Sequence, residues 1–142
     1  NYLTPVSNSN MARNYFENFG VGAVGGAHVE AIQVRQGTHV WSQILIDQTQ
    51  GGSSTASTVT GALHLTSEVA SSSTTMTDFI ILGTAAQGGQ YTIPISESFT
   101  TDITWTNGIW QEGLSGYVDT TGTPNVTESN NTDYDTGAPI SP

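Results

Sequence analysis

The chain has 142 residues, 10% of them charged, and a formal net charge of -10 at pH 7. It contains no cysteine, which excludes a disulfide framework and a thiolate zinc site. Lysine and arginine together number two, so nucleic-acid binding is not expected. Affinity for nucleic acid comes largely from basic side chains that displace counterions.

The remaining composition indicates one domain with a polar, mostly uncharged surface. A chain of this length can bury a core without disulfides or a structural metal. Its many Thr residues favour strands through their branched Cβ atoms. No apolar run approaches the roughly 20 residues that cross a bilayer, and the amino terminus lacks a secretory pattern. We therefore expect no membrane insertion. A hydroxylated and weakly charged surface suits inert solubility or lateral packing, so the expected location is an exterior one: a virion, or alternatively the cell surface or the extracellular space.

Residues 1–27 are predicted to form an amino-terminal arm and linker. Ser9 or Asn10 can cap a short helix that ends before Gly20; the alternative is an extended arm that docks on a neighbouring subunit. The glycine-rich run that follows lacks lysine, so we predict a connector rather than a phosphate-binding loop. The aromatic residues of this arm are Tyr2, Tyr15, Phe16 and Phe19.

Residues 28–122 are predicted to form a β-sandwich domain. Residues 28–35, HVEAIQVR, do not segregate apolar from polar side chains, which is compatible with an edge or interface strand. Residues 39–46, HVWSQILI, are almost continuously apolar, which indicates burial on both faces or a partner surface. Residues 58–66, TVTGALHLT, alternate between apolar and polar positions, which is typical of a strand on one side of a core.

The second half of this predicted domain continues the strand pattern. Residues 78–82, DFIIL, indicate a short buried strand, and residues 91–96, YTIPIS, alternate with a period of two. Asn107-Gly108 lies between apolar runs and is a strong hairpin signal. We therefore predict an all-β, antiparallel sandwich of the immunoglobulin-like or jelly-roll-like type. Its bulky core anchors are predicted to be Trp105, Ile109, Trp110 and Tyr117.

Residues 123–142 are predicted to form a polar carboxy-terminal tail. The segment has almost no apolar periodicity, so it cannot bury enough surface to offset its ordering entropy alone. We expect another subunit to hold the tail in place, and therefore a homo-oligomer. The predicted assembly interface consists of Tyr2, Tyr15, Phe16, Phe19 and Tyr134.

Candidates for catalysis are few. The three histidines lack the close spacing of a metal motif, and the serines lack the G-x-S-x-G elbow of hydrolases. Paired carboxylates on neighbouring strands are a glycosidase pattern, although solvated carboxylates at strand edges are far commoner. We predict no catalytic residue, no cofactor, no metal site and no enzymatic activity. The side chains considered are His28, His39, His64, Glu97, Asp102 and Glu112.

Two patterns in the tail involve possible ligands. Residues 131–137, NTDYDTG, place oxygen ligands at alternate positions before a glycine, as calcium loops do. The glycine comes one residue late and the distal Glu is missing, so weak calcium capture shared with another chain is kept only as an alternative. Asn125 and Asn130 each begin a glycan acceptor triplet, which matters only in a secreted protein.

Three segments, VRQGTHVWSQILI, TVTGALHLTSEV and GIWQEGLSGYVDTTG, carry a resemblance over residues 31–122. With Gln36-Gly37-Thr38, Val59-Thr60-Gly61-Ala62 and Gly108-Ile109-Trp110, they resemble β-sandwich domains of tailed-bacteriophage virion proteins. Such domains occur in baseplate and tail-fibre attachment and in capsid decoration. The sequence WQEGL departs from the aromatic-Asp-Leu strand of that family. The resemblance implies a structural, non-catalytic role with no active-site residues.

These observations predict a structural protein of a multi-subunit assembly. The first expectation is a phage virion component (decoration, neck or tail-fibre attachment) held by its two terminal segments. Its expected partners are further copies of itself and other virion or surface-lattice proteins. The alternative is an extracellular carbohydrate-binding module that stacks sugars on Trp41, Trp105 or Trp110.

Overall fold

The computed structural model describes residues 8–17, 30–34, 37–49, 61–65, 72–83, 91–95, 102–120 and 125–140. These segments contain strands and the turns between them. The strands are β1 (Ser9–Glu17), β2 (Ile32–Val34), β3 (Gly37–Asp47), β4 (Leu63–Leu65), β5 (Ser72–Thr77), β6 (Ile80–Leu82), β7 (Tyr91–Ile95), β8 (Asp102–Thr106), β9 (Ile109–Trp110), β10 (Gly116–Thr120), β11 (Asn125–Ser129) and β12 (Thr132–Asp133).

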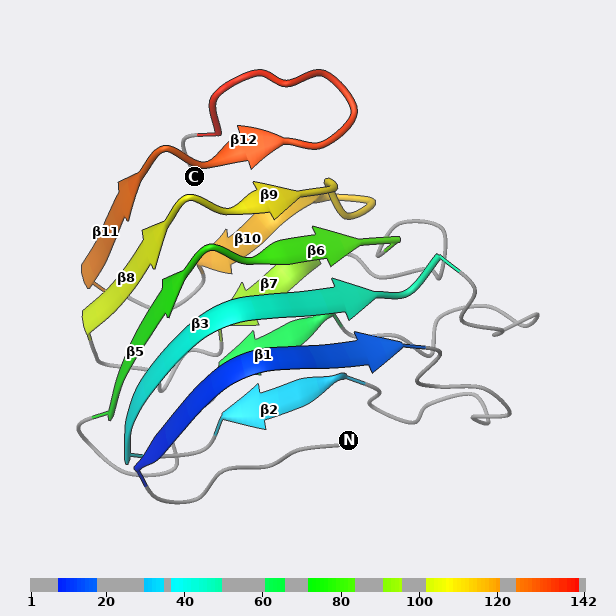
Figure 1. Cartoon of the computed structure of the whole chain (residues 1–142). Coiled ribbons are helices and arrows are strands. Elements are labelled where there is room, and N and C mark those ends of the chain that lie inside the picture. Colours follow the sequence, from blue (N-terminus) through cyan, green and yellow to red (C-terminus); the bar gives the residue numbers. More distant parts are fainter. Residues whose placement is uncertain are drawn as a thin grey trace.

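The described strands form two sheets, and every pairing between them is parallel. The larger sheet has five levels, in the order β1, then β3, then β5 and β6 together, then β8 and β9 together, then β11 and β12 together. The smaller sheet has the order β10-β7-β4-β2. The chain visits the two sheets in turn, so each strand pairs with one from the next circuit (Figure 1). This arrangement is a parallel β-coil, a solenoid in which successive turns of chain stack on one another.

The predicted antiparallel sandwich is therefore wrong, although the all-β content is correct. A parallel pair needs a long crossover between its strands, and here the opposite sheet supplies that crossover. The hairpin predicted at Asn107-Gly108 is wrong for the same reason. β8 and β9 do not pair with each other; they pair with β5 and β6 and form the two halves of one bent strand.

Both terminal segments add strands to this coil. Residues 9–17 form β1, which runs parallel to β3, so the helix alternative is wrong. Residues 125–133 form β11 and β12, which pair with β8 and β9. The expectation that this tail needs another subunit for order is therefore also wrong. The predictions for Tyr2, Phe19, His28 and Glu97 lie outside the described residues.

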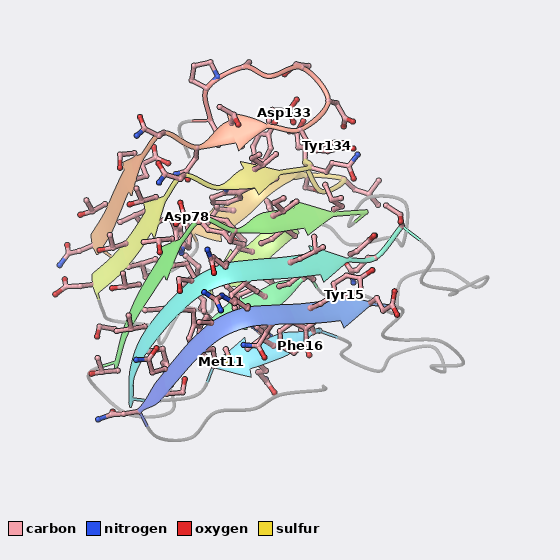
Figure 2. All side chains as sticks on the ribbon, in the orientation of Figure 1. Met11, Tyr15, Phe16, Asp78, Asp133 and Tyr134 are labelled. Atoms are coloured by element: carbon pink, nitrogen blue, oxygen red, sulfur yellow. The ribbon has the colours of Figure 1, made fainter. Side chains whose placement is uncertain are left out.

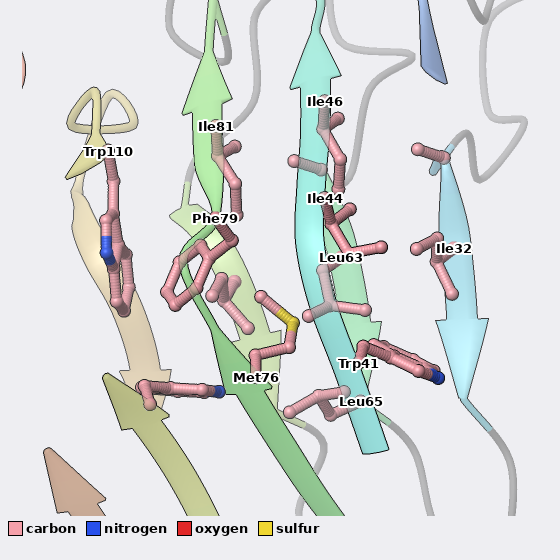
Figure 3. Packing of buried hydrophobic residues seen from close by; sticks show 14 of the residues in the cluster. Ile32, Trp41, Ile44, Ile46, Leu63, Leu65, Met76, Phe79, Ile81 and Trp110 are labelled. Carbon is pink, nitrogen blue, oxygen red and sulfur yellow. The ribbon is translucent and has the colours of Figure 1, made fainter. Parts of the chain in front are cut away.

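The core lies between the two sheets (Figure 3). Trp41, Met76 and Trp105 are in register on three neighbouring strands, and all three are fully buried. Burial of a large apolar side chain stabilises a fold by about 1.5–3 kcal/mol. The ring of Trp110 meets that of Trp105 edge-on, with centroids 5.2 Å apart. The predicted anchors Trp105 and Trp110 are confirmed, whereas Ile109 faces outward with 36% of its surface exposed.

Candidate functional site

A row of backbone bends crosses the larger sheet. Among the described residues, the non-glycine positions with positive φ lie on successive strands, with φ between 54° and 58°. Each bend residue lies beside the bend residue of the next strand. Each of them follows directly after a residue of a registered pair, such as Ser42 and Thr77. We call this row the bend ladder: Arg13, Gln43, Asp78, Asn107 and Asn130.

Side-chain hydrogen bonds connect much of the bend ladder. Arg13 Nε donates to Gln43 Oε1 at 3.1 Å, and Asn107 Nδ2 donates to Asp78 Oδ1 at 2.9 Å. Asn130 Nδ2 donates to Asn107 Oδ1 at 3.3 Å. Positive φ costs a residue with a side chain roughly 1–2 kcal/mol, and Asn and Asp tolerate it best. The ladder therefore bends every strand of the larger sheet at one place and divides its outer face into two limbs.

The outer face of the first limb, before the bend, carries rows of hydroxyl groups. Thr75, Thr104 and Thr127 lie side by side in register on β5, β8 and β11. A second row, two residues further along each strand, contains Thr77, Thr106 and Ser129. This pair of rows is polar and free of charge, while the same limb also exposes Val40 and Asp102. It agrees with the hydroxyl-rich exterior expected from the composition.

On the outer face of the second limb, after the bend, one row of side chains is apolar. Tyr15, Leu45, Ile80 and Ile109 lie in register on four neighbouring strands, and we call them the apolar row. The alternate positions on the same strands point into the core, and Ile46, Ile81 and Trp110 among them are fully buried.

One end of the apolar row carries a phenol that is 53% exposed, that of Tyr15 (Figure 2). Its hydroxyl donates to Glu17 Oε2 at 2.8 Å, and this bond raises the pKa of Tyr15. Arg13 lies two residues before it and Glu17 two residues after it on the same strand. The row thus has an exposed cation on one flank and an exposed anion on the other.

At the far end of the coil, residues 134–140 fold back over β12, and we call them the carboxy-terminal cap (Figure 1). The amide of Asp133 donates to Ala138 O at 2.8 Å, and that of Ile140 donates to Asn131 O at 2.9 Å. Thr132 and Pro139 form an antiparallel bridge. The outer edge of β12 is therefore already hydrogen-bonded within the chain.

The carboxylate of Asp133 holds this cap together. It accepts hydrogen bonds from the backbone amide of Thr136 at 2.7 Å, from the Thr136 hydroxyl at 2.5 Å, and from the Tyr117 hydroxyl at 2.7 Å. The bonds from Thr136 and Tyr117 lower the pKa of Asp133. Burial of the Tyr117 phenol, followed by its bond to this carboxylate, raises the pKa of Tyr117 above its ordinary value.

The calcium-like spacing of residues 131–137 therefore belongs to a hydrogen-bonded turn in which protein donors occupy the Asp133 oxygens. Among the described residues, no group of three or more His, Cys, Asp or Glu side chains is placed to hold a metal ion. Within the same segments, no helix has the length and apolar character needed to cross a bilayer.

The histidines considered for catalysis take separate structural roles where the structure describes them. His39 is buried, and its Nδ1 lies 2.8 Å from Ser9 Oγ, which also accepts a hydrogen bond from Trp41 Nε1 at 2.9 Å. His64 is on β4 of the smaller sheet, and its Nδ1 lies 3.2 Å from Oε1 of the buried Glu30. The two imidazoles thus have different partners on different sheets.

The structure does not bring the described candidate carboxylates together. Asp102 is exposed and accepts a hydrogen bond from Asn125 Nδ2 at 3.1 Å. Glu112 is exposed in the segment after β9, and in the described part of the chain the two carboxylates share no hydrogen bond. Asn125 and Asn130, the glycan acceptor candidates, are both exposed.

All three tryptophans are fully buried, so none provides a stacking platform for a sugar. Of the predicted interface residues, Tyr15 and Tyr134 are 53% and 54% exposed, whereas Phe16 is partly buried against the core of its own chain. Comparisons with protein families, curated proteins and solved structures found no match for this chain.

Sequence reasoning missed the bend ladder, although a short repeat indicates it. Residues 75–78, TMTD, residues 104–107, TWTN, and residues 127–130, TESN, share the pattern Thr-x-Thr/Ser-Asp/Asn. Each copy places two outward hydroxyl groups, one inward side chain and one bend residue at equivalent positions. Because its copies are separated by unequal intervals, the repeat is hidden from a search for one fixed period.

Proposed function

We propose that the protein is a non-catalytic structural component of a multi-subunit assembly, in which the β-coil acts as a stiff unit and its outer face contacts other subunits. The observation that carries this proposal is the apolar row. Tyr15 and Ile109 are 53% and 36% exposed, and the row faces away from the core. A row of apolar side chains that crosses four strands and reaches solvent offers a partner one continuous apolar strip.

The interior supports the role of a stiff unit. Neighbouring strands of the larger sheet are hydrogen-bonded in parallel, and tryptophan and methionine stack in register beneath them. The bend ladder adds a second line of hydrogen bonds across the same strands. The ionisable groups described above serve this framework, since Asp133 closes the cap and Glu30 is paired with His64.

The virion as the setting of this assembly stays a prediction. The fold implied by the resemblance to phage β-sandwich domains is wrong, because the strands are parallel. What still supports an exterior location is the acidic chain, with its net charge of -10, and the hydroxyl rows on the first limb. A cell surface is the alternative setting, and the same structural role applies there.

The test of this proposal is the mass of the whole chain in solution. We expect sedimentation velocity and native mass spectrometry to show a defined oligomer that becomes more populated as the protein concentration rises. A chain that stays monomeric at the highest soluble concentration contradicts the proposal.

A further inference from the structure

We infer that the apolar row is the contact between two copies of this chain, which lie side by side with their coil axes parallel and related by a two-fold axis along the coil. This inference rests on the proposed function and names its partner. The two chains contribute the same residues: Tyr15, Leu45, Ile80 and Ile109.

The row is shaped for a contact along the coil. Its members are in register on successive strands, and strands in a sheet lie ~4.8 Å apart, so the row is ~14 Å long. Covering apolar surface stabilises a complex by roughly 25 cal/mol per Å². A second chain that lies along the row covers all four side chains together, whereas a partner that crosses it covers one or two.

The residues on either side of the row decide between the possible arrangements of two copies. On each strand, the positions two residues before and two residues after the row member form its flanks. The bend flank contains Arg13, Gln43, Asp78 and Asn107, and the distal flank contains Glu17, Asp47, Leu82 and Gln111.

A two-fold axis parallel to the coil exchanges these flanks and keeps each strand level with its own copy. Arg13 then faces Glu17 of the partner subunit, and Glu17 faces the partner subunit's Arg13, which gives two opposite-charge contacts. At the next level, the Gln43 amide faces Asp47 of the partner subunit. This arrangement brings no two charges of the same sign together at these levels.

An antiparallel arrangement reverses the order of the strands instead. Arg13 then faces Asn107 of the partner subunit, and Glu17 faces the partner subunit's Gln111, so neither charge meets an opposite charge. Two chains that each carry a net charge of -10 repel each other. The parallel arrangement is favoured because it uses Arg13, one of only two basic side chains of Lys or Arg type, to offset that repulsion.

The contact is small. A strip ~14 Å long and four residues, or ~13 Å, wide covers about 200 Å² on each chain, against about 800 Å² in a standard interface. We therefore expect weak association of the isolated chain. In an assembly with many copies, effective concentration strengthens such contacts.

Because the chain lacks cysteine, single engineered cysteines test the geometry directly. In the parallel arrangement each row residue faces itself, so Tyr15→Cys alone and Ile109→Cys alone are each expected to form disulfide-linked dimers under mild oxidation. The matched control is Val40→Cys, because Val40 is 49% exposed on the first limb, and this variant is expected to stay largely uncrosslinked. Dimers that form only when Tyr15→Cys and Ile109→Cys are mixed show the antiparallel arrangement and overturn the inference.

Charge exchange provides the second test. Arg13→Glu and Glu17→Arg are each expected to weaken dimerisation about tenfold, since each turns two exposed charge pairs from attraction to repulsion. The combination of both changes restores it. Glu112→Arg changes the net charge as Glu17→Arg does, at an exposed position off the row, and is expected not to weaken the dimer. Ile109→Asp breaks the row without altering the bend ladder, in case Arg13→Glu disturbs folding.

The outcomes separate the two proposals. If the wild-type chain oligomerises and all of these variants oligomerise equally well, the inferred surface is overturned and the structural role stays intact. A wild-type chain that remains monomeric at every concentration overturns both. If the oligomer depends on the row but is larger than a dimer, the two-fold arrangement is overturned. It is also overturned if the row binds a different protein in place of a second copy.

Discussion

At the scale of single residues, the positive φ of Asn107 shows how local chemistry sets the shape of the sheet. Asn-Gly dipeptides accept positive φ readily, and on that basis the sequence indicates a turn at this position. Asn107 does have a φ of 56°, so the conformation of the residue was predictable. The chain nevertheless bends within one strand at Asn107 and does not reverse, because the backbone amide of Asn107 donates to Ser129 O in the neighbouring strand.

Substitution of Asn107 tests this account of the bend. Asn107→Ala is expected to lower the free energy of unfolding by about 1–2 kcal/mol, because alanine strains at positive φ and loses the ladder hydrogen bonds. Asn107→Gly removes the same hydrogen bonds without the strain, so it is expected to cost less. Urea unfolding of both variants measures the difference. Thr127→Ala, exposed on the first limb, is the control and is expected within about 0.5 kcal/mol of wild type. Equal stability of Asn107→Ala and wild type contradicts this account of the ladder.

Gly108 shows why the residue after the bend is small. A Cβ atom there would overlap the ring of Phe79 and the Nε1 atom of Trp110. Gly108→Ala is therefore expected to lower the free energy of unfolding by about 1–3 kcal/mol through overpacking. Differential scanning calorimetry of Gly108→Ala and wild type in one buffer measures this loss. The double variant Gly108→Ala with Phe79→Leu shortens the ring side chain, so it is expected to cost less than the two separate changes added together. Simple additivity of the two costs contradicts the overlap.

At the scale of elements, the sequence pattern was informative where one face of a strand is wet. In β8, Ile103 and Trp105 are buried and Thr104 is partly exposed, which is the period of two expected for such a strand. In β7 the same pattern misleads, because Thr92 is also fully buried and its hydroxyl donates to Gln111 O at 2.5 Å. A polar residue whose hydrogen bond is satisfied by a distant segment cannot be recognised from local alternation.

The carboxy-terminal cap shows the same limit. Its composition is that of a disordered tail, yet Asp133, Tyr117 and Thr136 satisfy one another's hydrogen bonds and order the turn. Tyr117 lies 16 residues before Asp133 in the sequence and on the other sheet, so the contact depends on how the two sheets are placed. The ligand-like spacing of residues 131–137 was visible, but the donors that fill it were not.

The cap has an expected pH dependence. The pKa of Asp133 is lower in the folded chain than its ordinary value of 3.8, so the unfolded chain takes up this proton first as the pH falls. The stabilisation by Asp133 is therefore complete above that ordinary value and is lost as the pH falls through the lower folded pKa. Asp133→Asn is expected to cost about 1 kcal/mol at pH 7 and progressively less in acid. Chemical denaturation of both chains between about pH 2 and pH 7, a range set around the ordinary carboxyl pKa, measures this. A cost that grows in acid contradicts the assignment.

At the scale of the whole molecule, the content of the fold was predictable and its topology was not. Parallel and antiparallel sheets share the period of two, so residues such as Trp41 and Ile44 appear buried in either arrangement. The direction of pairing depends on segments that return through the other sheet. The repeat of Thr-x-Thr/Ser-Asp/Asn was the one local sign of stacked strands, and it becomes recognisable once the strand registers are known.

The parallel coil also changes what the terminal segments do. Residues 9–17 and 125–133 are strands of the same sheet, at opposite ends of one stack (Figure 1). They are therefore part of the fold, and they still carry exposed side chains that the proposed assembly uses as contacts. The exposed Tyr15 is one of these side chains, and it comes from a segment whose alternate residues, including Phe16, pack against the core.

The central claim, that both terminal segments belong to one parallel stack, is tested most directly by a distance between spin labels at Ala12 and Ser129. These residues terminate the in-register series Ala12, Ser42, Thr77, Thr106 and Ser129, which covers four strand spacings. With the labelled chain diluted in unlabelled chain, pulsed electron resonance is expected to give one narrow distribution near ~19 Å, four times the ~4.8 Å spacing of strands. A broad distribution, or a single distance much longer than this, would contradict the parallel coil.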